Sequence, residues 1–138
     1  MAISGLVITY NEEKNIGKCI DALFEVCDEV IIVDSLSADN TVKIAEEKGA
    51  KVISQKFLGD GPQRTHGLPF CKNDWILNLD ADEFLDTDAK EFILKEKYLE
   101  GNYDAFSFRV KNFLADELID FSGWYPDHKV RFFNKKTA

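Results

Sequence analysis

The sequence predicts an α/β fold with a mostly parallel central sheet that helices cover on both faces. Two observations carry this prediction. Short apolar runs alternate along the chain with segments whose apolar residues recur at helical spacing. The first runs are continuously apolar, as is typical of strands buried on both faces. A strand–helix–strand alternation of this kind joins parallel strands through right-handed crossovers.

The first part of the chain is predicted to hold three strands and two helices. The strands are expected over residues 3–9, 29–34 and 50–53, which are the apolar runs. The first helix is expected over residues 16–24, where apolar residues recur at helical spacing. The second helix is expected to be N-capped by Asp39 or Asn40 and to end at Gly49.

The middle of the chain is predicted to hold a glycine-rich loop, a fourth strand and a third long helix. The loop spans residues 57–62, and Gly67 and Pro69 make the short helical piece after it irregular. The fourth strand is expected over residues 75–80. The helix is expected over residues 87–98, with an exposed, charged face.

The pattern changes from about residue 103 onwards. Residues 105–110 and 129–133 alternate apolar and polar side chains, which predicts extended strands in a mixed or antiparallel arrangement. No internal repeat or linker interrupts the sequence. We therefore expect residues 1–138 to form one domain.

Composition excludes several classes of protein. The chain has 138 residues and a net charge of -8, and it has no Lys/Arg cluster large enough to hold a nucleic-acid backbone. A nucleotide substrate stays open, because one metal ion and one arginine can bind a diphosphate. Three cysteines without a Cys-x-x-Cys pair predict reduced cytosolic thiols rather than zinc or disulfides. No apolar run reaches transmembrane length, and no signal peptide is expected.

Asp80-Ala81-Asp82 directly follows the apolar run of the fourth strand. Two carboxylates at the carboxyl end of a strand repel each other unless a cation or hydrogen-bond donors neutralise them. Hard oxygen ligands suit Mg²⁺ or Mn²⁺, which take their remaining ligands from phosphates and water. The pair therefore predicts a divalent-metal nucleotide site, although both residues could instead start a turn and cap the next helix.

A polar segment follows each of the first four predicted strands. Ligands of open α/β sheets bind at the carboxyl ends of the strands. The four segments are residues 9–12, 34–41, 59–64 and 80–83. Each has a simpler interpretation, because Asn11 and Asp39 could cap helices and Gly59 and Gly61 could only form a turn. Four such clusters at successive strand ends favour one shared site.

These segments resemble a known family. Four segments are similar to motifs of the family 2 glycosyltransferases. They are Thr9-Tyr10-Asn11-Glu12, Val33-Asp34-Ser35-x-Ser37-x-Asp39-x-Thr41, Gln63-Arg64 and Leu79-Asp80-Ala81-Asp82-Glu83. Gly123-Trp124-Tyr125-Pro126-Asp127 is similar to a segment of the bacterial lipopolysaccharide core β-1,4-glucosyltransferase-like subgroup. The resemblance implies the GT-A fold, a Rossmann-like three-layer α/β/α sandwich whose C-terminal part is mixed or antiparallel.

The resemblance also implies a role for each matching residue in a nucleotide-sugar site. Thr9, Tyr10 and Glu12 would border the base and ribose of the donor. Asp34 would accept a hydrogen bond from uracil, with Ser35 beside it. Arg64 would face the ribose or the phosphates, whose anionic oxygens suit a guanidinium.

The metal and the reacting groups are implied in the same way. Asp82 would bind Mg²⁺ or Mn²⁺ directly, while Asp80, separated from it by Ala81, would approach the ribose or a metal-bound water. Arg131 could assist at the diphosphate, or be an ordinary solvated charge. Asp127 is the candidate base for an inverting transfer, with an ordinary turn aspartate as its alternative.

The implied function is metal-dependent, inverting transfer of a hexose, glucose by preference, from a UDP-sugar to a bacterial envelope glycan such as lipopolysaccharide core. The partners would be the UDP-sugar donor and a glycan or glycolipid acceptor, met in the cytoplasm or peripherally at the inner face of the cytoplasmic membrane. Residues 1–100 would bind the donor. Residues 101–138 would form the acceptor side, which we expect to be truncated because family members are longer.

Three alternatives stay open. A donor-binding fragment without transferase activity fits the same motifs. A nucleotidyltransferase would need a glycine-rich, basic loop after the first strand, where residues 9–12 are acidic instead. A receiver-like signalling domain also binds Mg²⁺ at strand ends, but residues 9–12 do not fit its pattern.

Overall fold

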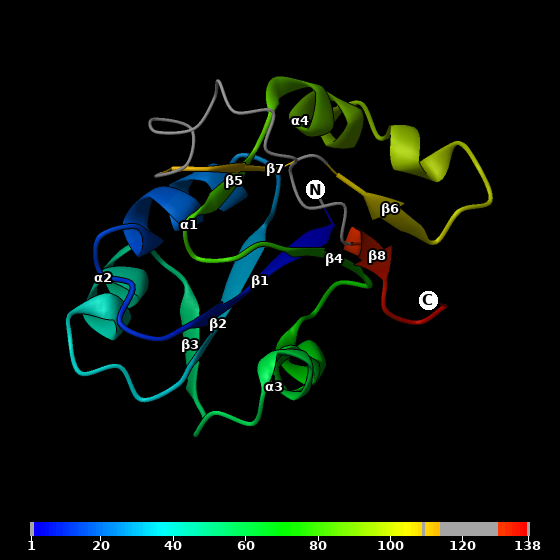
Figure 1. Ribbon diagram of the computed structural model, residues 1–138. Helices are drawn as coiled ribbons and strands as arrows, with labels where there is room; N and C mark the ends of the chain where they lie inside the picture. The colour runs from blue at the N-terminus through cyan, green and yellow to red at the C-terminus, as the bar shows by residue number, and fades with distance from the viewer. Residues whose placement is uncertain (1, 109, 114–129, 138) are drawn as a thin grey trace, which may run out of the picture.

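The computed structural model describes residues 2–108, 110–113 and 130–137 (Figure 1). Its main sheet has six strands in the order β3-β2-β1-β4-β8-β6. Four of them are parallel, namely β1 (Ile3–Thr9), β2 (Glu29–Asp34), β3 (Lys51–Ser54) and β4 (Trp75–Asn78). Strand β8 (Val130–Asn134) is antiparallel to both of its neighbours, β4 and β6 (Ala105–Ser107). The predicted mostly parallel sheet with a mixed C-terminal part is confirmed.

Helices cover both faces of this sheet. Helices α1 (Ile16–Phe24) and α2 (Thr41–Glu47) lie on one face, and α3 (Asp60–Gly67) lies on the other (Figure 1). Neighbouring residues of β1 point to opposite faces, so that Val7 belongs to the apolar cluster of α1 while Leu6 belongs to the cluster beneath α3. The predicted three-layer sandwich is therefore confirmed.

The second half of the chain departs from the predicted elements at two points. A single strand over residues 105–110 is wrong, because β6 ends at Ser107 and β7 (Val110–Asn112) belongs to a second sheet. There β7 pairs antiparallel with β5 (Glu83–Leu85), a strand that the sequence did not predict. Strand β5 directly follows Asp80-Ala81-Asp82 and turns the chain away from the main sheet.

Several predicted boundaries also move. The loop predicted over residues 57–62 ends earlier, because α3 begins at Asp60 and its first turn accommodates Pro62. The helix predicted over residues 87–98 is α4 (Thr87–Leu94) followed by a separate 3₁₀ turn, η2 (Lys97–Leu99). Glu96 separates them, since its φ of 56° does not continue an α-helix.

The fourth strand, predicted over residues 75–80, ends earlier at Asn78, and the third, predicted over 50–53, is Lys51–Ser54. The short 3₁₀ helix η1 (Leu68–Phe70) follows α3, where Gly67 and Pro69 predicted irregularity. All three cysteines are buried free thiols. Within the described part of the chain, no helix is long and apolar enough to cross a membrane.

Candidate functional site

The carboxyl ends of β1 and β2 meet through a buried hydrogen-bond network around Asp34. Thr9 lies opposite Asp34 in the β1–β2 register, and its hydroxyl donates to Asp34 Oδ1 at 2.7 Å. The Ser37 hydroxyl donates to the same oxygen at 2.6 Å, and the Ser37 backbone N–H donates to Oδ2 at 2.8 Å. Asp34 is 1% exposed. These three donors satisfy a carboxylate that would otherwise be costly to bury.

The loops after β1 and β2 are tied to each other. The Asn11 backbone N–H donates to the Ser37 hydroxyl at 2.8 Å, and Asn11 Oδ1 accepts from the Ala38 N–H at 2.8 Å. The Glu12 N–H donates to the Thr41 hydroxyl at 2.8 Å. Asn11 therefore bridges two loops, with a φ of 51° that Asn tolerates better than most residues.

A buried glutamine ties the loop after β3 to the same edge. Gln63, on α3, is fully buried, and its amide nitrogen donates to the Ser35 hydroxyl at 3.1 Å and to the Gln55 carbonyl at 3.0 Å. Its amide oxygen accepts from the Leu58 N–H at 3.0 Å. The side chain thereby fixes the start of α3 against β2, which also places the next residue, Arg64.

Arg64 reaches from α3 to the end of β4. Its Nη2 donates to Asp80 Oδ1 at 2.9 Å, and both side chains are partly exposed. With the Asn78 amide oriented to satisfy its neighbours, its oxygen accepts from Arg64 Nε at 2.9 Å and its nitrogen donates to the Leu6 carbonyl at 3.1 Å. The guanidinium is thus held between a buried amide and the first carboxylate of Asp80-Ala81-Asp82.

The turn from Asp80 to Glu83 is held by Glu83. The Glu83 N–H donates to the Asp80 carbonyl at 2.9 Å, and Glu83 Oε1 accepts from the Asp80 N–H at 2.8 Å. On its other side, Glu83 Oε2 accepts from Arg131 Nη2 at 2.9 Å. Arg131, on β8, is 1% exposed and pairs inside the protein, so this residue lies beneath the turn.

Negative charge is concentrated at this edge. Burial raises the pKa of Glu12, and the charges of Asp82, Asp39 and Asp80 raise it further. Burial also raises the pKa of Glu83, and the Arg131 guanidinium opposes that rise. Repulsion among neighbouring carboxylates is relieved when a cation binds between them.

The donor set fits a divalent cation that is shared with a phosphate ligand. Among the described residues, no three His, Cys, Asp or Glu side chains are grouped as a complete metal site. Mg²⁺ commonly takes only one or two protein carboxylates and completes its shell with water and substrate phosphates. Asp82 is partly exposed, and no hydrogen bond or ion pair occupies its carboxylate within the described ranges. Asp80 is engaged by Arg64 instead.

The structure brings most of the predicted site residues to one edge. They are Thr9, Tyr10, Glu12, Asp34, Ser35, Arg64, Asp80, Ala81 and Asp82. Arg131 is buried below them, and Asp127, the candidate base, lies outside the described residues together with Trp124 and Tyr125. Sequence reasoning gave no role to Ser37, Asn78 or Glu83. Asn78 contacts Arg64 and Leu6, and Glu83 contacts Arg131, all on other elements. Two contacts are local, because Ser37 bonds Asp34 and Glu83 bonds Asp80, each pair three residues apart. An Asp-x-x-Ser spacing could have suggested the first of these.

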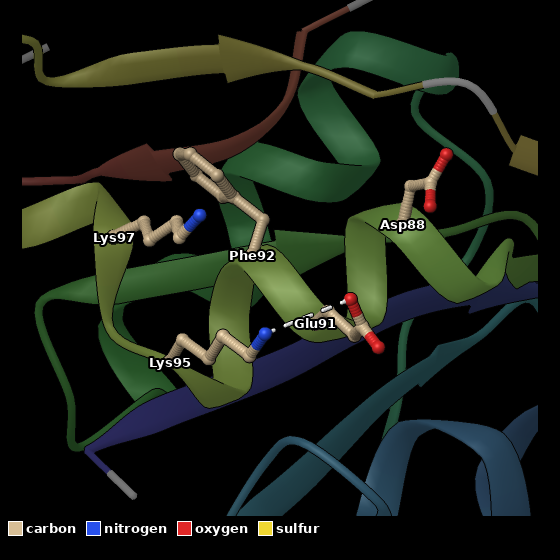
Figure 2. A pocket seen from close by; sticks show the side chains of 5 residues that line it. All are labelled: Asp88, Glu91, Phe92, Lys95 and Lys97. Atoms are coloured by element: carbon tan, nitrogen blue, oxygen red, sulfur yellow. Dashed lines mark ion pairs between the residues drawn. The ribbon is translucent and has the colours of Figure 1, made fainter.

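A hollow beside α4 shares no residue with this edge. It encloses about 230 Å³ and is lined by Asp88, Glu91, Phe92, Lys95 and Lys97 (Figure 2). Its acidic and basic side chains are mixed, and Glu91 and Lys95 approach each other to 3.9 Å. Two opposite charges so exposed contribute little to either stability or binding.

Comparison with known proteins gives the family. The model of glycosyl transferase family 2 matches residues 4–136. An uncharacterized glycosyltransferase of Rickettsia felis is 47% identical over 139 residues, which cover 99% of this chain and 49% of that protein. The lipopolysaccharide core biosynthesis glycosyltransferase LpsC of Rhizobium meliloti is 35% identical over 98 residues, 67% of this chain and 36% of LpsC. The chain thus spans about half or less of these two relatives.

Solved structures agree on the fold. Glucosyl-3-phosphoglycerate synthase from Mycobacterium tuberculosis, solved with Mn²⁺, UDP and glucosyl-3-phosphoglycerate, is 28% identical with a TM-score of 0.54, over 60% of this chain and 34% of that one. The mannosyltransferase PcManGT from Pyrobaculum calidifontis, solved with GDP-Man and Mn²⁺, is 20% identical with a TM-score of 0.66. The match covers 77% of this chain and 34% of that one. The second similarity concerns the fold alone. The predicted GT-A fold is confirmed.

Proposed function

This chain belongs to glycosyl transferase family 2, and we propose that the carboxyl edge of its sheet binds the nucleoside diphosphate of a sugar donor. The observation that carries the proposal is the convergence of Asp80, Asp82 and Arg64 beside the Thr9–Asp34 pair. In the complete reaction, we propose that a hexose, glucose by preference, passes with inversion from a UDP-sugar to a bacterial envelope glycan such as lipopolysaccharide core.

The nucleoside is proposed to lie against the ends of β1 and β2. Tyr10 is 60% exposed there and offers a ring for stacking, while Glu12 borders the ribose. Asp34 already accepts three hydrogen bonds from Thr9 and Ser37. Because a carboxylate has about four acceptor positions, one remains for the N–H of uracil. The synthase that is 28% identical was solved with UDP, which supports the choice of base.

The diphosphate is proposed to lie between Arg64 and Asp82. Arg64 presents a guanidinium whose position Asn78 and Asp80 fix, and that geometry suits anionic oxygens. Asp82 would hold Mg²⁺ or Mn²⁺ directly and Asp80 through a water. The bound ion would stabilise the charge that develops on the leaving diphosphate. The synthase that is 28% identical was solved with Mn²⁺, which supports this assignment.

The acceptor side is proposed from the family pattern. Asp127 would take the proton of the acceptor hydroxyl as that oxygen attacks C1 and the bond to the diphosphate breaks. The similarity to LpsC supports an acceptor that belongs to lipopolysaccharide core biosynthesis. We propose that this acceptor is met at the cytoplasmic face of the membrane. A donor-binding unit without transferase activity is the second candidate, since the chain matches only 49% of its Rickettsia felis relative.

Competition among nucleotide sugars tests the proposed donor. UDP-glucose, UDP-galactose and GDP-mannose would be titrated in the presence of Mn²⁺. We expect both UDP-sugars to bind better than GDP-mannose, because Asp34 is proposed to recognise the base, and we expect UDP-glucose, the proposed donor, to bind best. Equal binding of GDP-mannose would show that the base assignment is wrong. Release of UDP on addition of lipopolysaccharide inner core then separates the transferase from the donor-binding unit.

A further inference from the structure

The turn that carries both carboxylates of the proposed metal site is closed by a side chain. Glu83 uses its two carboxylate oxygens for two different donors. Oε1 accepts from the backbone N–H of Asp80 at 2.8 Å, and Oε2 accepts from Arg131 Nη2 at 2.9 Å. Together with the backbone bond from Glu83 N–H to the Asp80 carbonyl, this joins the first and last residues of the turn twice.

Arg131 links this turn to the sheet. It lies on β8, next to Phe132, which pairs with Leu77 of β4. Its side chain is 1% exposed, and its Nη1 lies 3.9 Å from Asp80 Oδ1. Arg64 approaches the same oxygen at 2.9 Å. The Asp80 carboxylate therefore lies between two guanidiniums that come from α3 and from β8.

Stability alone does not account for a buried pair of this kind. A buried ion pair carries a large desolvation cost, and replacing both partners with apolar residues is often neutral or stabilising. The pair does fix the orientation of the Glu83 side chain, because its two oxygens must each meet a different donor. Within the described residues no hydrogen bond orients the Asp82 carboxylate, so its direction follows from the backbone of the turn.

We propose that Glu83 and Arg131 are positioning residues, which hold the turn so that Asp82 presents its carboxylate to a divalent cation. Arg131 orients Glu83, and Glu83 fixes the backbone of Asp80 to Asp82. The role of Arg131 is then exerted through Glu83 and not through contact with the diphosphate of the donor. The inference rests on the proposed function, because it concerns the metal of that same site.

The test measures Mn²⁺ binding and UDP binding separately. Mn²⁺ affinity is taken from the electron paramagnetic resonance signal of free Mn²⁺, and UDP affinity from calorimetry with and without Mn²⁺. The variants are Glu83→Gln and the double variant Glu83→Met/Arg131→Met, with Glu91→Gln on the exposed face of α4 as the control. Removing groups that orient a metal ligand typically costs about 10- to 100-fold in metal affinity. We expect that loss in both site variants, with UDP affinity in the absence of metal unchanged.

Several results would overturn the inference. One such result is a folded variant that binds Mn²⁺ as tightly as the wild type, even if its melting temperature falls. The Glu83–Arg131 pair would then contribute only to stability. An equal loss of UDP affinity without metal would show that Arg131 contacts the diphosphate. The double variant covers the case in which Glu83→Gln does not fold, since it leaves no buried charge unpaired between these two positions. Failure of the wild type to bind UDP or Mn²⁺ would instead overturn the proposed function and this inference with it.

Discussion

Asp80 and Asp82 are two residues apart, yet their surroundings differ. Asp80 is engaged by Arg64 at 2.9 Å and lies 3.9 Å from Arg131. Asp82 is partly exposed, and its charge contributes to the raised pKa of Glu12. The sequence predicted the carboxylate pair. It could not reveal which of the two carboxylates pairs with arginine. The guanidiniums near Asp80 belong to Arg64 and Arg131, which are 16 and 51 residues away in the sequence.

Asp82→Asn is expected to remove the metal-dependent part of UDP binding. Asparagine keeps the shape of the side chain and loses the charge that attracts the cation, so we expect UDP affinity in Mn²⁺ to fall at least about tenfold. Calorimetry would measure this, with Asp88→Asn on α4 as the matched control. Unchanged affinity of the Asp82 variant in Mn²⁺ would remove this residue from the metal site.

Asp34→Ala is expected to weaken UDP binding without altering its dependence on metal. The substitution also leaves the Thr9 hydroxyl and the Ser37 N–H without their acceptor, which costs about 1–3 kcal/mol of stability. Calorimetry with UDP and GDP separates the two effects, since only a base contact changes the preference between them. Ser37→Ala, which removes one hydrogen bond to Asp34 at a residue with no proposed contact to the nucleotide, is the control. An equal loss for both nucleotides would mean that Asp34 only supports the fold.

At the scale of the elements, α3 is the part that carries Arg64 to the site. Gly67 ends this helix where it packs against the sheet. A Cβ atom on Gly67 would lie 2.6 Å from Val33 Cγ2 and 2.7 Å from Leu6 Cδ1. These contacts are closer than side chains tolerate, so the close approach of α3 to β1 and β2 requires glycine.

Gly67→Ala is therefore expected to destabilise the protein by about 1–3 kcal/mol, the usual cost of overpacking. Gly61→Ala in the first turn of the same helix is the control, because nothing lies within 4 Å of its Cβ position. That change should be neutral or stabilising, since it reduces the freedom of the unfolded chain. Urea denaturation of both variants measures the difference. Similar midpoints would contradict the close packing of α3.

The elements themselves divide into those that local pattern predicts and those that it does not. Continuous apolar runs placed β1 and β2 correctly, and the mostly parallel order followed from the crossovers. Strand β5 was missed because its Glu83-Phe84-Leu85 is too short for a periodicity and begins with a charge. Residues 105–110 alternate apolar and polar side chains as a single strand would. They are divided because β6 pairs with β8 in the main sheet, whereas β7 pairs with β5 in the second sheet.

The site residues also divide into those that the sequence predicted and those that it did not. Thr9, Asp34, Arg64 and the Asp80–Asp82 pair were placed at one edge because each follows a strand. The Glu83–Arg131 pair was not foreseen, because its partners are 48 residues apart and a single sequence does not reveal such contacts. Arg131 was predicted either to assist at the diphosphate or to be an ordinary solvated charge. The second prediction is wrong, because Arg131 is 1% exposed and pairs with Glu83.

At the scale of the whole molecule, acidic charge exceeds basic charge by 8, and part of that excess is concentrated at the site. Carboxylates held close together destabilise the folded state when they are ionised. Binding of a cation to the folded state alone would relieve this repulsion and raise the apparent stability by mass action. The concentration of charge therefore links the site to the pH dependence of folding.

Glu12→Gln is expected to stabilise the metal-free protein at neutral pH. The pKa of Glu12 is raised in the folded state, so its contribution to stability is fully present below the ordinary value of 4.5 and is lost as pH rises through the folded pKa. Glutamine avoids that loss. Urea denaturation at neutral pH should show the gain, and measurements below pH 4.5 should show none. Glu91→Gln is the control, and a gain of equal size at both pH values would contradict the argument.

The carboxyl edge of the sheet is proposed to bind a uridine diphosphate together with a divalent cation. Calorimetric titration of UDP with and without Mn²⁺, against GDP and ADP, tests it most directly. We expect UDP to bind in the presence of Mn²⁺, more weakly in its absence, and in preference to the other two nucleotides. Equal binding of all three nucleotides, or UDP binding that Mn²⁺ does not strengthen, would mean that this edge is not the proposed donor site.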